Sequence, residues 1–140
     1  MCHLHRMVCL LTTLGTLAAL SGCDNGLASV KGNVTFNGEP VNRGMINLEP
    51  VDGKGPVSGA SVEGGKFEMK DVTPGEKIVR ISAVYVKSVN KESDGSEIEV
   101  CEDLLPKEYG QASAHRLTVE APLTEKDYAI EGPDPRKKGK

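Results

Sequence analysis

The sequence predicts an all-β domain built from seven short antiparallel strands. Between residues 28 and 130, apolar residues recur at every second position in short runs. Glycine, proline and asparagine separate these runs, as is typical of turns between strands. No stretch of this region has the three- and four-residue apolar spacing of an amphipathic helix. Seven such strands favour a β-sandwich of two packed sheets.

The first two strands are expected to be joined by a tight turn. In the first strand, apolar and polar residues alternate, which gives one buried face. Its expected buried side chains are Val30, Val34 and Phe36. The pair Asn37-Gly38 takes positive φ at little cost and predicts a hairpin turn. The second strand is expected at residues 45–49, before a loop at residues 50–56.

Three more strands follow in the middle of the chain. Gly64-Gly65 predicts a tight hairpin between strands at residues 57–63 and 66–70. Pro74-Gly75 fits the two central positions of a type II turn, which leads into the longest strand, at residues 77–86. Four side chains are expected on the buried face of that strand: Val79, Ile81, Ala83 and Tyr85.

The last part of the domain is less regular. Residues 87–103 are mostly polar and charged, which predicts either an exposed excursion or a frayed edge strand. Leu117 and Val119 mark a sixth strand, and Tyr128 and Ile130 mark a seventh. We therefore expect one β-sandwich domain over residues 28–131.

An apolar stretch precedes this domain and ends at a cysteine. Residues 7–20 have the length of the apolar part of a signal peptide and are too few for a membrane span, which needs roughly 20 residues. Leu20, Ser21 and Gly22 then lead into Cys23. This pattern resembles the lipobox of bacterial lipoproteins. The resemblance implies a signal peptide over residues 1–22, cleavage before Cys23, lipidation of that cysteine and a short tether over residues 23–27.

The cellular location of the protein follows from the resemblance to a lipobox. Two or three acyl chains on Cys23 would anchor the protein firmly, since each buried CH2 contributes about 0.8 kcal/mol. Membrane lipid is then a partner, and the protein belongs to the cell envelope, on the non-cytoplasmic side of either the inner or the outer membrane. Two alternatives stay open, namely an ordinary secretory signal in which Cys23 is incidental and an uncleaved N-terminal anchor.

Cleavage would also limit the cysteine chemistry. It removes Cys2 and Cys9, and lipidation of Cys23 would leave Cys101 with no partner for a disulfide. We therefore predict no disulfide framework.

Charge and the C-terminal composition bear on possible partners. The net charge of −3 gives no support to nucleic-acid binding. Residues 132–140 combine glycine, proline and a basic cluster, which predicts a disordered basic tail. Such a tail could contact anionic lipid or an anionic wall polymer weakly.

The motifs together resemble a known family. They are the run Val30-x-Gly32-x-Val34-Thr35-Phe36-Asn37-Gly38-Glu39-Pro40, then Ile46-x-Leu48-x-Pro50, then Gly65-x-Phe67-x-Met69-x-Asp71-Val72-x-Pro74-Gly75. The chain is similar to the carboxypeptidase regulatory-like, or transthyretin-like, domains of small bacterial lipoproteins. That resemblance implies a seven-stranded Greek-key sandwich of the transthyretin/prealbumin type. Lys77 departs from the family pattern, so we expect the start of that strand to be a sheet edge.

Two features are candidates for contact with a ligand or partner. Glu92, Asp94, Glu97 and Glu99 gather in the acidic excursion, where carboxylates could hold calcium or form a solvated loop. Tyr109 follows a proline and could belong to a contact surface or close the open end of the sandwich.

The residues favour a binding function over catalysis. His115 is the one histidine after Cys23, and we find no nucleophile, metal-ligand or phosphate-binding motif, so we predict no catalytic residue, metal site or cofactor. A hydrolase would need a carboxylate cluster around His115. We expect a lipid-anchored binding or structural module with an envelope protein as its partner. The alternative is a carbohydrate or wall-polymer binder, although the absence of tryptophan weakens a sugar-stacking surface.

Overall fold

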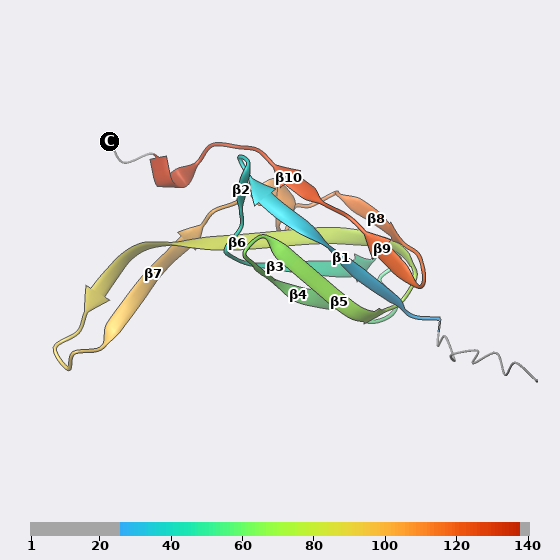
Figure 1. The fold of residues 1–140 in the computed structure, drawn as a ribbon, viewed down its shortest axis with the longest axis horizontal. Helices are drawn as coiled ribbons and strands as arrows, with labels where there is room; N and C mark the ends of the chain where they lie inside the picture. The colour runs from blue at the N-terminus through green and yellow to red at the C-terminus, as the bar shows by residue number, and fades with distance from the viewer. Residues whose placement is uncertain (1–25, 138–140) are drawn as a thin grey trace, which may run out of the picture.

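A computed structural model describes residues 26–137 and contains ten strands and two short 3-10 helices in that range (Figure 1). This arrangement confirms the all-β fold, with more strands than the seven predicted. The strands are β1 (Ala28–Phe36), β2 (Glu39–Pro40), β3 (Arg43–Pro50), β4 (Ser58–Glu63), β5 (Lys66–Val72), β6 (Gly75–Lys91), β7 (Glu97–Asp103), β8 (Arg116–Val119), β9 (Leu123–Glu125) and β10 (Tyr128–Ile130). The 3-10 helices are η1 (Lys107–Tyr109) and η2 (Pro135–Lys137). The predicted signal peptide and Cys23 lie outside the described residues.

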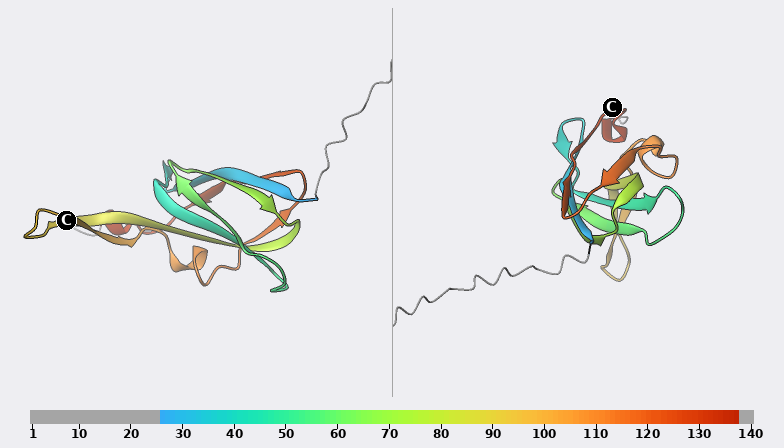
Figure 2. Two further views of the ribbon diagram at one scale, coloured as in Figure 1. Left: turned by 90° about the horizontal axis from the view of Figure 1, so that it is seen from below. Right: turned by 90° about the vertical axis from the view of Figure 1, so that its right-hand side faces the viewer.

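The strands form one continuous series of hydrogen-bonded neighbours, in which the pairing between β4 and β5 is very short. The order is β10-β1-β5-β4-β3-β6-β7, with β2 and β9 also on β1 and β8 also on β6. Between β4 and β5 the pairing is limited to Glu63 and Lys66, beside their hairpin turn. The strands therefore separate into two layers, β1-β5-β9-β10 and β3-β4-β6-β8, which curve around a shared core (Figure 2).

The pairing of β1 differs from the antiparallel pattern that was predicted throughout. Both β9 and β10 run parallel to β1. The reason is the path of the chain, because β8 lies on β6 in one layer and the turn through Pro122 brings β9 to β1 in the other. The N-terminal strand is thus held by segments from the middle and from the end of the chain.

The core is made from the alternating faces predicted by the sequence. On β1, Val30, Val34 and Phe36 are buried, and the hairpin turn after them has positive φ at both Asn37 and Gly38. The expected face of β6 is also confirmed, since Val79, Ile81 and Ala83 are buried and Tyr85 packs partly buried against the core.

Strand β6 is longer than predicted and its start is not a sheet edge. It runs from Gly75 to Lys91, whereas residues 77–86 were expected. Lys77 lies between Pro50 of β3 and Leu117 of β8, and it is only 3% exposed. Its ammonium group donates a hydrogen bond to the hydroxyl of Thr73 at 2.8 Å. The expected edge is therefore wrong, because β8 pairs with this part of β6 on one side and β3 on the other.

Residues 87–103 form most of a protruding hairpin, which consists of the last part of β6, a turn and β7. The last part of β6 pairs with β7, from Val84 opposite Asp103 to Lys91 opposite Glu97. The register shifts between Val86 and Ser88. We call residues 84–103 the arm. It leaves the body at the end opposite to the start of β1 (Figures 1 and 2).

The segment after β10 is held against the β1–β2 turn, which differs from the disordered tail predicted from residue 132. The side chain of Asn37 exchanges two hydrogen bonds with the backbone of Gly132, both at 3.0 Å. Arg136 forms ion pairs of 2.8 Å with Asp134 and with Glu39. These contacts fasten residues 132–137, whereas residues 138–140 lie outside the described part.

Gly32 marks a close approach of two backbones. It lies in the middle of β1, opposite Phe67 of β5, and a Cβ atom there would stand 1.8 Å from the carbonyl oxygen of Lys126. The amide of Lys126 donates in turn to the carbonyl of Lys31 at 3.0 Å. Only glycine leaves room for this crossing.

Gly32→Ala should therefore destabilise the domain, by about 3 kcal/mol, since the β9–β10 segment must move away from β1. Thermal or urea unfolding measures this loss. Ser61→Ala is the control, because Ser61 is an exposed residue of β4 and the substitution adds no Cβ atom. Equal stability of the two variants would contradict the crossing.

The ion pair between Arg136 and Asp134 predicts that the stability of the domain depends on pH under acidic conditions. The guanidinium of Arg136 hydrogen-bonds to Asp134 and lowers the pKa of that carboxyl from 3.8 to about 2. A folded-state pKa below the unfolded value gives stability that is present above pH 3.8 and is lost as the pH falls toward 2. The stability difference between the wild type and Asp134→Asn should thus shrink over this range in urea titrations. A difference that does not change with pH would contradict the ion pair.

Candidate functional site

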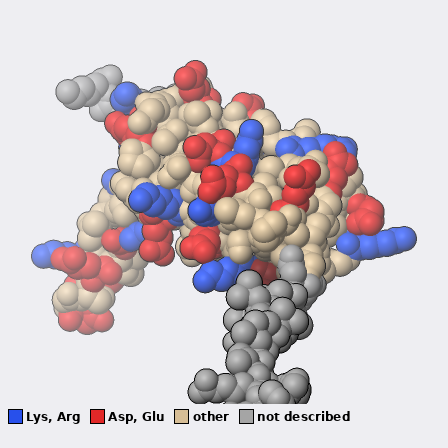
Figure 3. Space-filling model, turned by 45° about the vertical axis from the view of Figure 1, so that its right-hand side comes forward, with Lys and Arg blue, Asp and Glu red and all other residues tan. Residues whose placement is uncertain are grey.

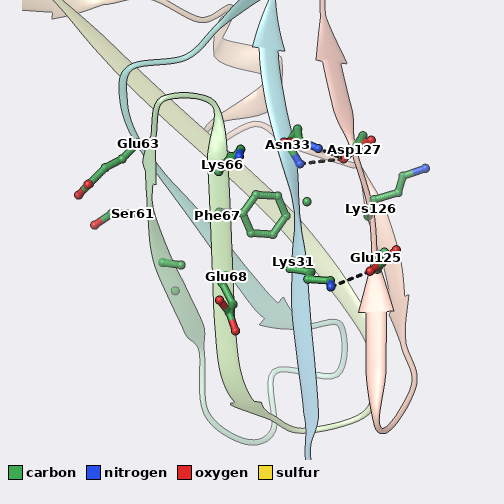
Figure 4. A pocket seen from close by; sticks show the side chains of 13 residues that line it. Lys31, Asn33, Ser61, Glu63, Lys66, Phe67, Glu68, Glu125, Lys126 and Asp127 are labelled. Carbon is green, nitrogen blue, oxygen red and sulfur yellow. Dashed lines mark hydrogen bonds and ion pairs between the residues drawn. The ribbon is translucent and has the colours of Figure 1, made fainter.

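An open groove lies where β4 and β5 diverge, and it extends across β1 to the segment between β9 and β10 (Figure 4). Its volume is about 800 Å³. The lining residues are Lys31, Gly32, Asn33, Gly59, Ala60, Ser61, Glu63, Lys66, Phe67, Glu68, Glu125, Lys126 and Asp127. This lining is mostly polar, and it joins segments that are far apart in the sequence.

Two polar contacts fix one wall of the groove. Lys31 forms an ion pair with Glu125 at 2.9 Å, and the hydrogen bond to that carboxylate raises the pKa of Lys31. Asp127 accepts hydrogen bonds from the backbone amide of Asn33 at 2.8 Å and from its side chain at 2.9 Å. Figure 4 shows both pairs bridging β1 and the neighbouring segment.

The groove contains one aromatic ring, and that ring is buried. Phe67 is 4% exposed, lies opposite Gly32 and has its ring centroid 6.3 Å from that of Tyr128. Burial also raises the pKa of Tyr128 to about 12. The groove can therefore offer hydrogen bonds and charge to a polar ligand, whereas its aromatic ring has little free face for stacking.

The acidic candidates from the sequence lie together on the arm. Glu92 and Asp94 belong to its turn, and Glu97 and Glu99 lie on β7. Asp94 accepts hydrogen bonds from the hydroxyl and the amide of Ser96, which lower its carboxyl pKa. Within residues 26–137, no three acidic, histidine or cysteine side chains are grouped as a metal site would require.

The base of the arm is joined by polar side chains. Glu102 accepts a hydrogen bond from the hydroxyl of Tyr85 at 2.9 Å and pairs with Lys87 at 2.5 Å. Both contacts lower the pKa of Glu102, Lys87 more than Tyr85. Glu99 pairs with Arg43 of β3 at 2.7 Å, which connects the arm to the body.

Tyr109 lies apart from the acidic residues. It follows Pro106 in η1, packs partly buried against the core, and stacks on the ring of His115 with centroids 4.6 Å apart. In the described part of the chain, no ion pair connects His115 to a carboxylate. The four acidic candidates thus share one element, the arm, whereas Tyr109 packs against the core outside it.

Sequence reasoning did not find the groove. Its residues come from four separate stretches, which the antiparallel pairing of β1 with β5 and the parallel pairing of β9 and β10 with β1 bring together. The sequence did contain one sign of the close approach beside the groove. A glycine inside a strand often marks a place where another backbone comes near, and Gly32 lies at such a position.

The fold defines the class of protein as an all-β sandwich module. No protein-family model matches the sequence, and no curated protein matches it either. Among solved structures, a Pseudomonas aeruginosa protein proposed to bind carbohydrate has a TM-score of 0.41 at 13% identity, over 76% of this chain and 89% of that one. A 9R-lipoxygenase from Cyanothece has a TM-score of 0.35 at 14% identity, over 79% of this chain but only 17% of the lipoxygenase. None of the helices described in residues 26–137 has the length and apolar character to cross a membrane.

Proposed function

We propose that this protein is a lipid-anchored module of the cell envelope that binds a partner and carries out no catalytic step. The observation that supports it is the position of the two ends of the domain. Strand β1 begins at Ala28, five residues after Cys23, and the arm projects from the opposite end (Figure 1). A chain of this length spans at most about 18 Å, so an acylated Cys23 would hold the domain close to the lipid.

This orientation has a consequence for binding. The end with Ala28 would face the bilayer, and the arm would reach away from it into the envelope. A partner protein could then contact the arm without competition from lipid. Membrane lipid bound through the acyl chains and an envelope protein bound through the arm are the two partners of this proposal.

A second candidate function is binding of carbohydrate or wall polymer in the groove. Its support is the polar lining around Lys66 and Glu68 beside Asn33 and Asp127. Such side chains exchange hydrogen bonds with sugar hydroxyls, although the buried ring of Phe67 gives little stacking.

Cys23→Ser should abolish labelling of the full-length protein with radioactive palmitate in growing cells, because the acceptor thiol is lost. It should also shift the protein from the detergent-rich to the aqueous phase in phase partitioning. Cys101→Ser is the matched control and should keep both properties, since Cys101 lies on the arm. Labelling that persists in Cys23→Ser would refute the anchor.

Lys66→Glu should weaken co-sedimentation of the full-length protein with purified envelope polysaccharide if the groove binds it, since a donor is replaced by a carboxylate. Lys54→Glu is the control, because Lys54 is an exposed lysine in the β3–β4 loop, away from the groove. A wild-type protein that stays in the supernatant would remove this second candidate.

A further inference from the structure

The arm has two strands and two open edges. Strand β7 ends the order of strands in the sheet, and residues 84–91 of β6 pair with β7 alone. Among the described residues, no strand therefore pairs with either outer edge of the arm. Free edges of this kind expose backbone amides and carbonyls that another strand can use, and an isolated two-stranded hairpin is only marginally stable in water.

Apolar side chains lie on both faces of the arm. The cross-strand register places Ile98 and Val100 on one face, and they are 49% and 37% exposed. Val86 and Val89 lie on the other face and are 40% and 50% exposed. Their clustering on one protruding element distinguishes them from scattered surface apolar residues and is typical of a contact surface.

The charges of the arm are divided between its strands. Residues 84–103 contain six carboxylates and two lysines. Lys87 and Lys91 already pair with Glu102 and Glu97, at 2.5 and 3.4 Å. In Figure 3 the arm projects at the lower left, with carboxylates gathered toward its tip. Arg43 of β3 also pairs with Glu99, so the carboxylates of the arm that hold no ion pair in the described residues are Glu92, Asp94 and Asp103. The arm therefore keeps an excess of negative charge at its turn and at the last residue of β7.

This charge pattern distinguishes between possible occupants of the β7 edge. Along β7, acidic and apolar residues alternate as Glu97-Ile98-Glu99-Val100. An antiparallel copy of β7 centred on Val100 would place Glu97 opposite Asp103, and like charges directly opposite destabilise a strand pair. A strand with lysine or arginine at alternate positions would instead meet opposite charges.

We propose that the outer edge of β7 is a docking site for an extended basic segment of a partner protein, which adds to the arm as a third strand. Backbone hydrogen bonds would supply affinity, and the alternating acidic and apolar side chains of β7 would select the segment. This inference rests on the proposed function, because it names the chemistry of the partner that the arm would contact.

The test measures binding of a fluorescent peptide of alternating lysine and valine to the full-length protein in mild detergent. Fluorescence anisotropy gives the affinity, and a peptide of alternating glutamate and valine is the comparison. We expect the lysine peptide to bind about tenfold or more tightly, since several cross-strand ion pairs act together. Its binding should weaken as salt is added.

Two variants locate the site. The double substitution Ile98→Thr and Val100→Thr removes apolar surface but keeps residues that favour strands, so the arm should still form. The double substitution Glu97→Gln and Asp103→Asn removes charge alone. Each should reduce binding of the lysine peptide about tenfold, whereas Val57→Thr, which alters an apolar residue 59% exposed outside the arm, should not.

Each result has a distinct meaning. Equal binding of the two peptides, or full binding by both double variants, would overturn the inference. Self-association in sedimentation that is lost in Ile98→Thr/Val100→Thr would assign the edge to a second copy of this chain and would likewise overturn it. Palmitate labelling of Cys23 is measured separately, so failure of the peptide to bind would leave the anchored module standing.

Discussion

The close contact between β1 and the C-terminal segment is the constraint on which the rest of the structure depends. Strand β1 pairs with β5 on one side and with β9 and β10 on the other, and the crossing at Gly32 lets the backbone at Lys126 pass. This crossing holds β9 and β10 in the same layer as β1. It also brings Glu125 and Asp127 beside Lys31 and Asn33, so one wall of the groove depends on it.

Strand β6 connects this body to the arm without a break. Its first half is buried between β3 and β8, and its second half is exposed and pairs with β7. A continuous strand gives the arm a fixed base, which the contacts of Glu102 with Tyr85 and of Glu99 with Arg43 support. The arm can therefore present a strand edge at a defined position, because its direction is set by the core rather than by a loop.

Local patterns explain how much of this could be predicted from the sequence. Alternation on β1 and β6 predicted their buried faces, and Asn37-Gly38 predicted its turn, because these signals lie within a few residues. The parallel pairing of β9 and β10, the burial of Lys77 and the groove depend on contacts between distant segments, for which no local pattern exists. The arm was predicted only as an excursion or a frayed edge, since exposed strands of mixed polarity carry a weak periodic signal. Cys23 stays a prediction, as it lies outside the described residues.

The groove and the arm are distinct surfaces with different physical character, which bears on how the protein could work. The groove is a polar hollow, and the side chains of one wall are already joined in pairs, Lys31 with Glu125 and Asn33 with Asp127. A ligand there must compete with those contacts for hydrogen bonds. At the outer edge of β7 the backbone groups meet no strand in the described part of the chain, although the side chains of Glu97, Glu99 and Glu102 already hold ion pairs. Adding a strand there would satisfy these backbone groups and cover part of the apolar side chains of the arm, which favours the arm over the groove as the surface for a protein partner.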